Sequence, residues 1–365
     1  LFRLQGRFED ALKEYDQALA LRPAYPDALC NRGNALCELN KFADAKASFN
    51  AAIKLRPDNA EAYFNRGLSL LHMGDFRYGW VDYEWRKKCL VTAAARRYMQ
   101  PVWRGEDIAG KTLFVYSEQG LGDTLHFCRF AQMAEKRGAN VVVAAPRTLH
   151  RILRPLRVID EDRIPESFDV HCAMLSLPLA FKTTLETIPA ETPYLFADAR
   201  EIEMFSARLP ASQRPRVGIA WAGKQTYAKD RWRSIPFSQL APLLANNSVD
   251  WVSLQHDVPQ ADEKMLAASN IMDWGRNFAD FAAAAAAIMT LDLVITVDTA
   301  VAHLAGALGK PVWIMLPFSS DWRWLCDRTD TPWYPTARLF RQKQRDDWES
   351  VMGDVSAELS NFRSS

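Results

Sequence analysis

The sequence lacks the features of a secreted, zinc-binding or membrane-spanning protein. Its six cysteines form no Cys-x-x-Cys pair, which argues against a zinc site and predicts reduced thiols in a cytoplasmic protein. No segment combines the basic start and apolar centre of a signal peptide. The most apolar run, 281–297, is interrupted by Thr290 and Asp292, so it predicts a buried helix followed by a buried strand, not a membrane span.

An excess of charge of one sign is also missing. Lysine and arginine total 45 and aspartate and glutamate 44, which gives a formal net charge of +1. Without a basic block, the sequence argues against nucleic acid or an anionic membrane as the main partner. The 365 residues are 48% hydrophobic and 24% charged, which predicts about two or three globular domains. Because Leu1 lies inside a repeat, we expect the chain to be part of a longer protein with further repeats upstream.

The first 90 residues repeat with a period of 34. This period, with small residues where helices cross and aromatic residues between neighbouring units, resembles the tetratricopeptide repeat, a pair of antiparallel helices. Proline ends the second helix of each unit. The matching positions are Leu21-Arg22-Pro23 with Leu55-Arg56-Pro57, Asn31-Arg32-Gly33 with Asn65-Arg66-Gly67, and Phe8 with Phe42 and Phe76.

Two features of these repeats carry expectations about function. In the last unit Arg86 replaces a small residue, and Trp80 and Trp85 are expected to cap the array against the following domain. Asn31 and Asn65 occupy the same repeat position, and a side-chain amide can donate to and accept from a peptide backbone at once. We therefore expect both to bind an extended protein partner in a groove. The alternative is that they only join adjacent repeats.

The rest of the chain alternates strands and helices, which predicts parallel α/β sheets. A helix is expected over 123–137, and the polar segment 199–215 is expected to be a linker between two strand–helix sets. Two Rossmann-like domains would then face each other across a cleft, with ligands at the carboxyl ends of the strands. The expected strands are 111–116, 140–145, 216–221, 250–255, 291–297 and 311–316.

Three loops at strand ends contain chemically active side chains. Loop 1 (117–122) holds two glycines and leads into a helix expected to begin at Asp123, with His126 on the same face. Asp123 can simply cap this helix. Alternatively, a carboxylate held ionised by a helix N-terminus can take a proton from an acceptor hydroxyl. His126 by itself is more often a packing residue.

Loop 2 (221–236) gathers cationic and hydroxyl groups ahead of Pro236, which can open a helix. It is either a solvated basic loop or a diphosphate clamp. In a clamp, Arg233 and Ser234 would donate to phosphate oxygens, with Lys224 as a further cation in the same loop.

Loop 3 (297–299) follows a buried strand and precedes a helix rich in alanine and glycine. Asp298 or Thr299 is expected to cap that helix, and its N-terminus can bind an anion. Thr299 and His303 share one face of the helix. The alternative is a capped core helix without a ligand.

Together these motifs resemble the two-domain GT-B glycosyltransferases, and most closely the bacterial heptosyltransferase family. Repeats ahead of a GT-B unit also resemble the protein O-linked N-acetylglucosamine transferases. Arg stands for the family's Lys in the second motif and Ala300 for its Gly in the third. The motifs are Gly122-Asp123-Thr124-Leu125-His126 for Gly-Asp-x-x-His, Arg233-Ser234-Ile235-Pro236 for Lys-x-x-Pro, and Asp298-Thr299-Ala300-Val301-Ala302-His303 for Asp-Thr-Gly-x-x-His.

The resemblance implies three domains: repeats and cap (1–100), an acceptor-side Rossmann-like domain (101–205) and a donor domain (206–365). It implies transfer of a sugar from a nucleotide sugar to a hydroxyl of a protein or glycan that the repeats present. Asp123 would be the general base, with His126 beside it as a second catalytic residue. The implied donor-binding residues are Lys224, Arg233, Ser234, Gln255, Asp298, Thr299 and His303.

No metal cofactor is expected, because the loops and helix N-terminus already supply positive charge for a diphosphate. The single Asp-x-Asp match, 160–162, lies in a charged segment that is expected to be an exposed loop. Two other functions stay open. One is a repeat-based scaffold with an inactive GT-B domain, and the other is a sugar-nucleotide epimerase.

Aromatic residues are dense late in the chain. We expect them to pack in the core and as a lid over the cleft, and the alternative is that they stack on a sugar. They are Trp313, Trp322, Trp324, Trp333 and Tyr334.

Overall fold

The computed structural model describes residues 2–89, 98–227 and 229–362, and the chain forms two compact units. Each unit is assembled from segments that are distant in the sequence. The predicted domain boundaries after residues 100 and 205 stay predictions. Unit 1 comprises Leu1–Asp107, Ser176–Ile188 and Asp321–Arg328, and unit 2 comprises Ile108–Leu175, Pro189–Ser320 and Thr329–Ser365.

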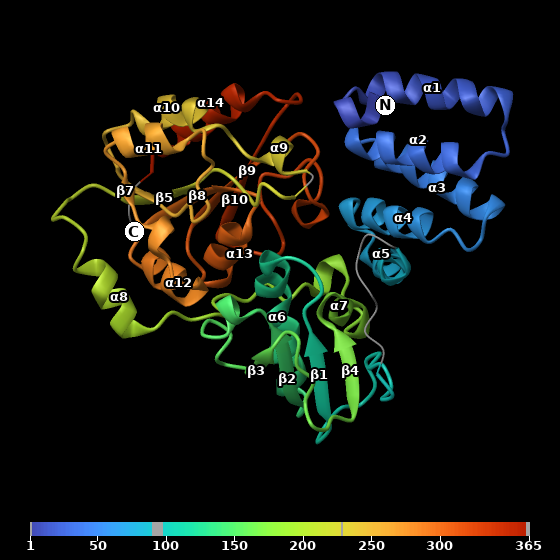
Figure 1. Cartoon of the computed structure of the whole chain (residues 1–365), viewed down its shortest axis with the longest axis horizontal. Helices are drawn as coiled ribbons and strands as arrows, with labels where there is room; N and C mark the ends of the chain where they lie inside the picture. Colours follow the sequence, from blue (N-terminus) through green and yellow to red (C-terminus); the bar gives the residue numbers. More distant parts are fainter. Residues whose placement is uncertain (1, 90–97, 228, 363–365) are drawn as a thin grey trace. The chain divides into compact units, whose positions relative to one another are not determined.

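Unit 1 is built on the helices of the predicted repeats, which Figure 1 shows in blue. Each helix packs against the next along the chain, and the small and aromatic repeat positions Ala45, Phe49 and Ala52 are fully buried between them. With η for a 3-10 helix, the elements are η1 (Phe2–Gln5), α1 (Phe8–Leu21), α2 (Pro26–Glu38), α3 (Phe42–Leu55), α4 (Ala60–His72), α5 (Phe76–Tyr83) and η2 (Glu84–Lys88).

Two arginines at equivalent repeat positions, 34 residues apart, make equivalent hydrogen bonds between helices. Each donates to a side chain 16 residues before it and to another 16 residues after it, and so joins its own helix to both neighbouring helices. The pairs are Arg32 with Asp16 (2.7 Å) and Ser48 (2.8 Å), and Arg66 with Asn50 (2.8 Å) and Asp82 (2.6 Å). The tetratricopeptide prediction is confirmed.

The end of the repeat array is covered by two segments from later in the chain. Trp80 is buried, its Nε1 donates to the carbonyl of Thr183 at 3.0 Å, and its ring meets Trp322 edge-on with centroids 5.2 Å apart. Trp85 instead stacks flat on Tyr63 of its own repeat, with centroids 4.1 Å apart. Trp80 is therefore a cap, as predicted, whereas Trp85 is not.

A buried ionic cluster fixes one of these covering segments. The Oε1 atom of Glu84 accepts from Arg86 at 2.7 Å and from the Ser176 hydroxyl at 2.6 Å, and Arg86 also donates to that hydroxyl at 2.8 Å. Burial would raise the pKa of Glu84, but Arg86, Lys87 and the hydroxyl bond together lower it to about 2. Arg86 replaces the small residue of the repeat because it holds this carboxylate.

We expect acid to weaken unit 1 through Glu84. The pKa of this group is lower in the folded chain (about 2) than its ordinary 4.5, so its contribution is complete above pH 4.5 and disappears as the pH falls towards 2. At about 1.4 kcal/mol per pH unit, this shift contributes about 3–4 kcal/mol. Thermal unfolding of wild type and Glu84→Gln between pH 2 and 6 measures it. The difference in stability should shrink with acid, and parallel curves would contradict the assignment.

Unit 2 contains two parallel sheets, one for each predicted Rossmann-like half. Figure 1 shows strands β1 to β4 in green and β5 to β10 in yellow to red. The orders are β3-β2-β1-β4 and β10-β9-β8-β5-β6-β7. The strands are β1 (Thr112–Tyr116), β2 (Asn140–Ala145), β3 (Arg157–Asp160), β4 (Val170–Ala173), β5 (Arg216–Ala220), β6 (Asp250–Ser253), β7 (Met272–Asp273), β8 (Leu293–Val297), β9 (Val312–Leu316) and β10 (Ala337–Arg341).

Helices connect these strands. The apolar run 281–297 is a helix followed by a strand, as predicted, and β8 and β9 are buried along their whole length, as strands covered on both faces must be. The main helices are α6 (Leu121–Lys136), α7 (Leu177–Ala180, in unit 1), α8 (Ala199–Ser206), α9 (Asp230–Arg233), α10 (Phe237–Leu244), α11 (Glu263–Ala268), α12 (Phe281–Met289), α13 (Ala300–Ala307) and α14 (Trp348–Leu359). Shorter 3-10 turns are η4 (Arg147–Leu149), η5 (Met174–Ser176), η6 (Leu185–Thr187), η7 (Gly275–Asn277) and η8 (Trp322–Trp324).

The sequence expectations differ from this fold in three places. The segment 199–215 is not a plain linker, because Asp198 caps helix α8 by accepting from the Arg200 amide at 2.9 Å. Strands β3, β4, β7 and β10 were not predicted, since three of them have four residues or fewer and β10 has arginines at its second and last positions. Asp160 ends β3 and pairs with Arg147, so only the rest of 160–162 is exposed.

The late aromatic residues are all buried. Trp313 and Tyr334 pack in unit 2, and none of the five rings is more than 7% exposed. Packing is thereby confirmed, and sugar stacking is contradicted because no ring face is open. Within the described ranges no helix is long and apolar enough to cross a bilayer.

Candidate functional site

Helix α6 begins two residues earlier than predicted, and this changes the place of Asp123. Gly120 is the N-cap and Asp123 lies in the first turn, where its Oδ2 accepts from the Gly120 amide at 2.8 Å. Asp123 is partly exposed. Its carboxylate therefore closes the first turn of α6 from inside, and the side chain still has access to solvent.

Loop 2 is a compact structure organised around the buried carboxylate of Asp230. Its Oδ1 accepts from Arg233 Nε at 3.0 Å and its Oδ2 from the Ser234 hydroxyl at 2.8 Å. Ser234 Oγ in turn accepts from the Gly223 amide at 2.9 Å. The loop is thus held in shape by its own side chains, while Lys224 is exposed.

Two predicted donor contacts are used inside the loop itself. The hydroxyl hydrogen of Ser234 goes to Asp230, which leaves it no hydrogen for a phosphate in this structure. Gln255 is buried, and its Oε1 accepts from the amides of Trp221 and Ala222 at 2.9 and 3.0 Å. Its Nε2 donates to the carbonyls of Ala222 and Asp257, so the backbone engages the oxygen and both amide hydrogens of this side chain. For Ser234 and Gln255 the contacts favour a structural role over ligand binding.

The three loops predicted from the sequence come together in unit 2. Arg233 Nη1 donates to the carbonyl of Asp298 at 2.8 Å, which joins loop 2 to loop 3. A Cβ placed on Gly122 would lie 3.0 Å from His303 Cδ2 and 3.4 Å from Ala300 Cα, so loop 1 lies directly on the first turn of α13. Only a residue without a side chain fits so closely there.

This convergence makes a region of positive potential. Helices α6 and α13 pack against each other, and each places its N-terminal end, with partial positive charge, at the loops. Thr299 is the N-cap of α13, and its hydroxyl lies 3.3 Å from that of Thr296. Among the described residues, Arg233 Nη2 has no hydrogen-bond partner, so it can donate to a ligand. Such an arrangement suits a phosphate or diphosphate.

His126 and His303 lie behind this region and not on its surface. Both are buried, and both Nδ1 atoms contact the same hydroxyl, that of Tyr334, at 2.8 and 2.9 Å. The two imidazole rings are 5.0 Å apart. Their predicted roles at the reacting groups stay predictions, and the structure gives both a shared buried partner instead.

Arg129 supports the same buried cluster with a charge. It is 3% exposed and donates to the carbonyls of His126, Pro189 and Trp333 and to the Tyr194 hydroxyl, at 2.7–3.0 Å. Burial lowers the pKa of Arg129, but the phenols of Tyr194 and Tyr334 raise it more, so the guanidinium stays charged. Its described partners are all neutral, which adds positive potential beneath the helix N-termini.

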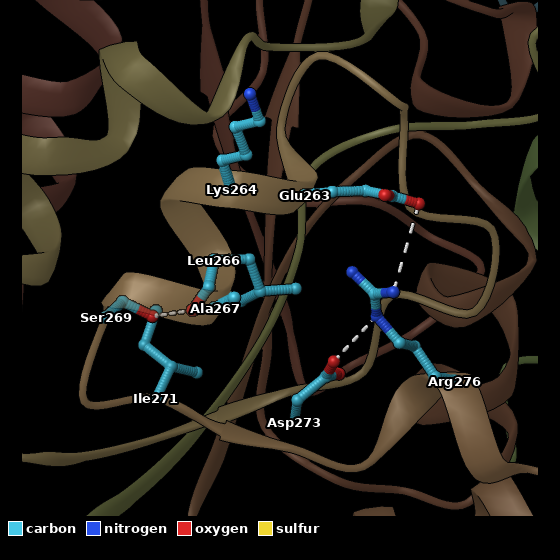
Figure 2. A pocket seen from close by; sticks show the side chains of 8 residues that line it. All are labelled: Glu263, Lys264, Leu266, Ala267, Ser269, Ile271, Asp273 and Arg276. Atoms are coloured by element: carbon cyan, nitrogen blue, oxygen red, sulfur yellow. Dashed lines mark hydrogen bonds and ion pairs between the residues drawn. The ribbon is translucent and has the colours of Figure 1, made fainter.

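A separate cavity of about 560 Å³ lies beside α11 and β7 in the second sheet. Figure 2 shows Arg276 pointing between two carboxylates, at 2.9 Å from Asp273 and 3.9 Å from Glu263. None of the residues predicted from the sequence lines this cavity. Across the ranges 2–89, 98–227 and 229–362, no three His, Cys, Asp or Glu side chains gather as metal ligands.

Comparison with known families identifies the two parts of the chain. Residues 1–38 and 33–74 match the TPR repeat, and residues 179–316 match glycosyltransferase family 9 (heptosyltransferase). A tetratricopeptide-repeat match is thus followed by a glycosyltransferase family 9 match, which covers 138 of the 365 residues. The predicted helical repeats, followed by two parallel α/β sheets, are confirmed. The family 9 match contains loops 2 and 3, whereas loop 1 and Asp123 lie outside it.

Individual relatives resemble larger parts of the chain. Protein FlbA of Caulobacter vibrioides is 29% identical over 325 residues, and the chain spans about half, 54%, of its length and 80% of its own. The E. coli ADP-heptose LPS heptosyltransferase II is 16% identical over 69% of this chain and 99% of its own, with a TM-score of 0.48. A variant of the Thermobaculum terrenum O-GlcNAc transferase is 12% identical over 98% of this chain and 82% of its own, with a TM-score of 0.29.

Three residues that organise unit 2 carry no direct signal in the sequence. Asp230 stands between Lys229 and Arg231, in a loop whose composition indicates a basic surface. Tyr334 stood out only as one of several aromatic residues, and Arg129 as an ordinary helix cation. The two histidines were a usable signal, because a buried pair of imidazoles requires a polar partner.

Proposed function

We propose that the chain transfers a sugar from a nucleotide-sugar donor to a hydroxyl of a protein or glycan, without a metal cofactor. The observation that carries this proposal is the meeting of loops 1, 2 and 3, with Asp123 in the first turn of α6 beside the first turn of α13. We place the reaction in the cytoplasm. The six cysteines of the chain are free thiols, which suits a reducing compartment.

The proposed reaction uses the two sides of this site differently. Asp123 takes the proton of the acceptor hydroxyl, whose oxygen forms a bond to the anomeric carbon of the sugar. The bond from that carbon to the diphosphate breaks, and the nucleoside diphosphate leaves with the electron pair. Arg233 and the N-terminal end of α13, with Asp298 and Thr299, stabilise the leaving charge.

The donor experiment uses the purified chain and a panel of nucleotide sugars. Thermal shift selects the donors that bind, and incubation with the selected donor, carrying a labelled sugar, and with proteins or glycans follows. We expect the label on an acceptor, equally with and without EDTA. Free labelled sugar alone would instead support hydrolysis or an epimerase, and activity restored only by Mg²⁺ or Mn²⁺ would contradict the metal-free proposal.

A repeat-based scaffold with an inactive family 9 domain is the second candidate. The observation in its favour is that Ser234, Gln255 and His303 are engaged by the protein itself, and that Ala300 stands where the resembling family has Gly. Tight nucleotide-sugar binding without any product, over the whole acceptor set, would favour this alternative.

We further propose that Asn31 and Asn65 capture the acceptor protein. Both lie on helices of equivalent repeat position, α2 and α4, and both side chains are partly exposed. The Arg beside each of them already joins the neighbouring helices, which supports a role for the amides other than joining repeats.

We expect Asn31→Ala with Asn65→Ala to raise KM for a protein acceptor about 10- to 100-fold with little change in kcat. Two backbone hydrogen bonds, each contributing about 0.5–1.5 kcal/mol, are lost. Asn50→Ala is the control, because Asn50 accepts from Arg66 and its loss should lower Tm without affecting the acceptor. A large loss of Tm in the double variant with unchanged KM would assign both amides to joining the repeats.

A further inference from the structure

One hydroxyl joins the two halves of unit 2 where α6 and α13 meet. Tyr334 is fully buried, and its oxygen lies 2.8 Å from Nδ1 of His126 on α6 and 2.9 Å from Nδ1 of His303 on α13. Gly306 on α13 makes room for it, since a Cβ there would lie 2.5 Å from Tyr334 Cδ1. The bridge therefore connects a helix of the first sheet to a helix of the second.

The number of hydrogens restricts how this bridge can be made. A phenol has one hydrogen and two lone pairs, and a neutral imidazole carries a hydrogen on only one of its two nitrogens. Tyr334 can donate to one histidine and accept from the other, which satisfies both short contacts. The neutral pair then holds opposite tautomers, one with hydrogen on Nδ1 and the other with hydrogen on Nε2.

The surrounding groups favour this neutral arrangement. An extra proton on the pair would place a second positive charge beside Arg129, whose guanidinium lies 4.8 Å from the Tyr334 ring centre. With a hydrogen on both Nδ1 atoms, the Tyr334 oxygen would accept from both histidines, and its own hydrogen would have to point to Tyr194. The Tyr194 oxygen is 3.5 Å away and already accepts from Arg129. The rings of Phe127 and Trp333, which pack against His126, carry no charge.

We propose that Tyr334 is a positioning residue, whose hydroxyl fixes His126 and His303 in opposite tautomers and so holds the first turns of α6 and α13 in the register that transfer requires. The proposal rests on the proposed function for its catalytic consequence. Gly122 lies against His303 and Ala300, and Asp123 follows it in the chain. A movement of either histidine therefore shifts the carboxylate relative to α13.

The first test does not depend on activity. The full chain is labelled with ¹⁵N-histidine and studied by NMR, where the ring nitrogen shifts report the tautomer of each histidine. The signals of the six histidines are assigned with variants that each replace one of them. We expect opposite tautomers for His126 and His303 in wild type, and faster amide hydrogen exchange in both first turns in Tyr334→Phe. Identical tautomers, or unchanged exchange, overturn the proposal even if no sugar is transferred.

The second test measures transfer. In Tyr334→Phe we expect kcat to fall about tenfold or more, because a 1 Å misplacement can cost about 10²-fold, while affinity for nucleoside diphosphate is unchanged. Tyr83→Phe, which alters a buried tyrosine of unit 1, is the matched control and should keep wild-type kcat. With wild type active, an unchanged kcat in Tyr334→Phe overturns the positioning role, whereas inactive wild type contradicts only the proposed function.

Discussion

Asp123→Asn is expected to lower the rate of transfer about 10²- to 10⁴-fold and to leave the affinity for nucleoside diphosphate almost unchanged. Loss of a general base has an effect of this size. In wild type the Gly120 amide donates to Asp123 Oδ2 at 2.8 Å, and the amide oxygen of Asn can accept the same hydrogen bond, so the first turn of α6 is preserved. Initial rates at saturating donor, with calorimetric titration of the diphosphate, separate the two quantities.

Asp198→Asn is the matched control for this variant. The side chain of Asp198 also caps a helix of unit 2, α8, but this helix lies outside the three loops. It should keep the wild-type rate. If Asp123→Asn transfers sugar as fast as wild type, Asp123 only caps α6, and the base must be sought elsewhere.

Arg233→Ala is expected to weaken both donor binding and rate. A charge-assisted hydrogen bond contributes about 1.5–3 kcal/mol, which is about 10- to 100-fold in affinity. The rate should fall further than the affinity, because negative charge on the leaving diphosphate increases in the transition state. The variant also loses the bond from Nη1 to the Asp298 carbonyl, which positions loop 3.

Two further variants make the Arg233 experiment specific. Arg233→Lys should recover part of both effects, since Lys keeps the charge but loses the planar set of donors. Arg231→Ala removes an exposed arginine of the same helix, α9, and should behave as wild type. Equal diphosphate affinity in wild type, Arg233→Ala and Arg233→Lys would remove Arg233 from the site and move the clamp to Lys224 or Lys229.

Much of the fold could be predicted because the spacing of apolar residues along the sequence reflects which side chains are buried. The repeats were visible since helix packing restricts the same positions every 34 residues, and six strands were visible as apolar runs. Strand β7 has two residues, and arginines at the second and last positions of β10 leave only two apolar residues between them, so neither strand forms such a run. The helix in 199–215 was missed because its polar residues face solvent and its cap, Asp198, lies just before the segment.

The site was predictable as a set of loops but not as a set of contacts. Sequence order identifies which side chains follow strands, and the topology brings those ends together. Whether Ser234 faces a ligand or Asp230 depends on a loop conformation that no spacing encodes. The partnership of His126 with Tyr334 spans 208 residues and arises only when the two sheets are assembled.

The composition of unit 1 limits how this protein can be recombined. The cap on Trp80 is supplied by Thr183 and Trp322, and these two segments interrupt the first and the second Rossmann-like half respectively. The repeats therefore cannot be exchanged as an independent domain. A chimera joined near residue 100 would inherit Trp322 without Phe76, Trp80 and Tyr83, whose rings surround it. Exchange between relatives preserves the fold only if the last repeat and both inserted segments are inherited together, so these three stretches of chain are expected to change in concert.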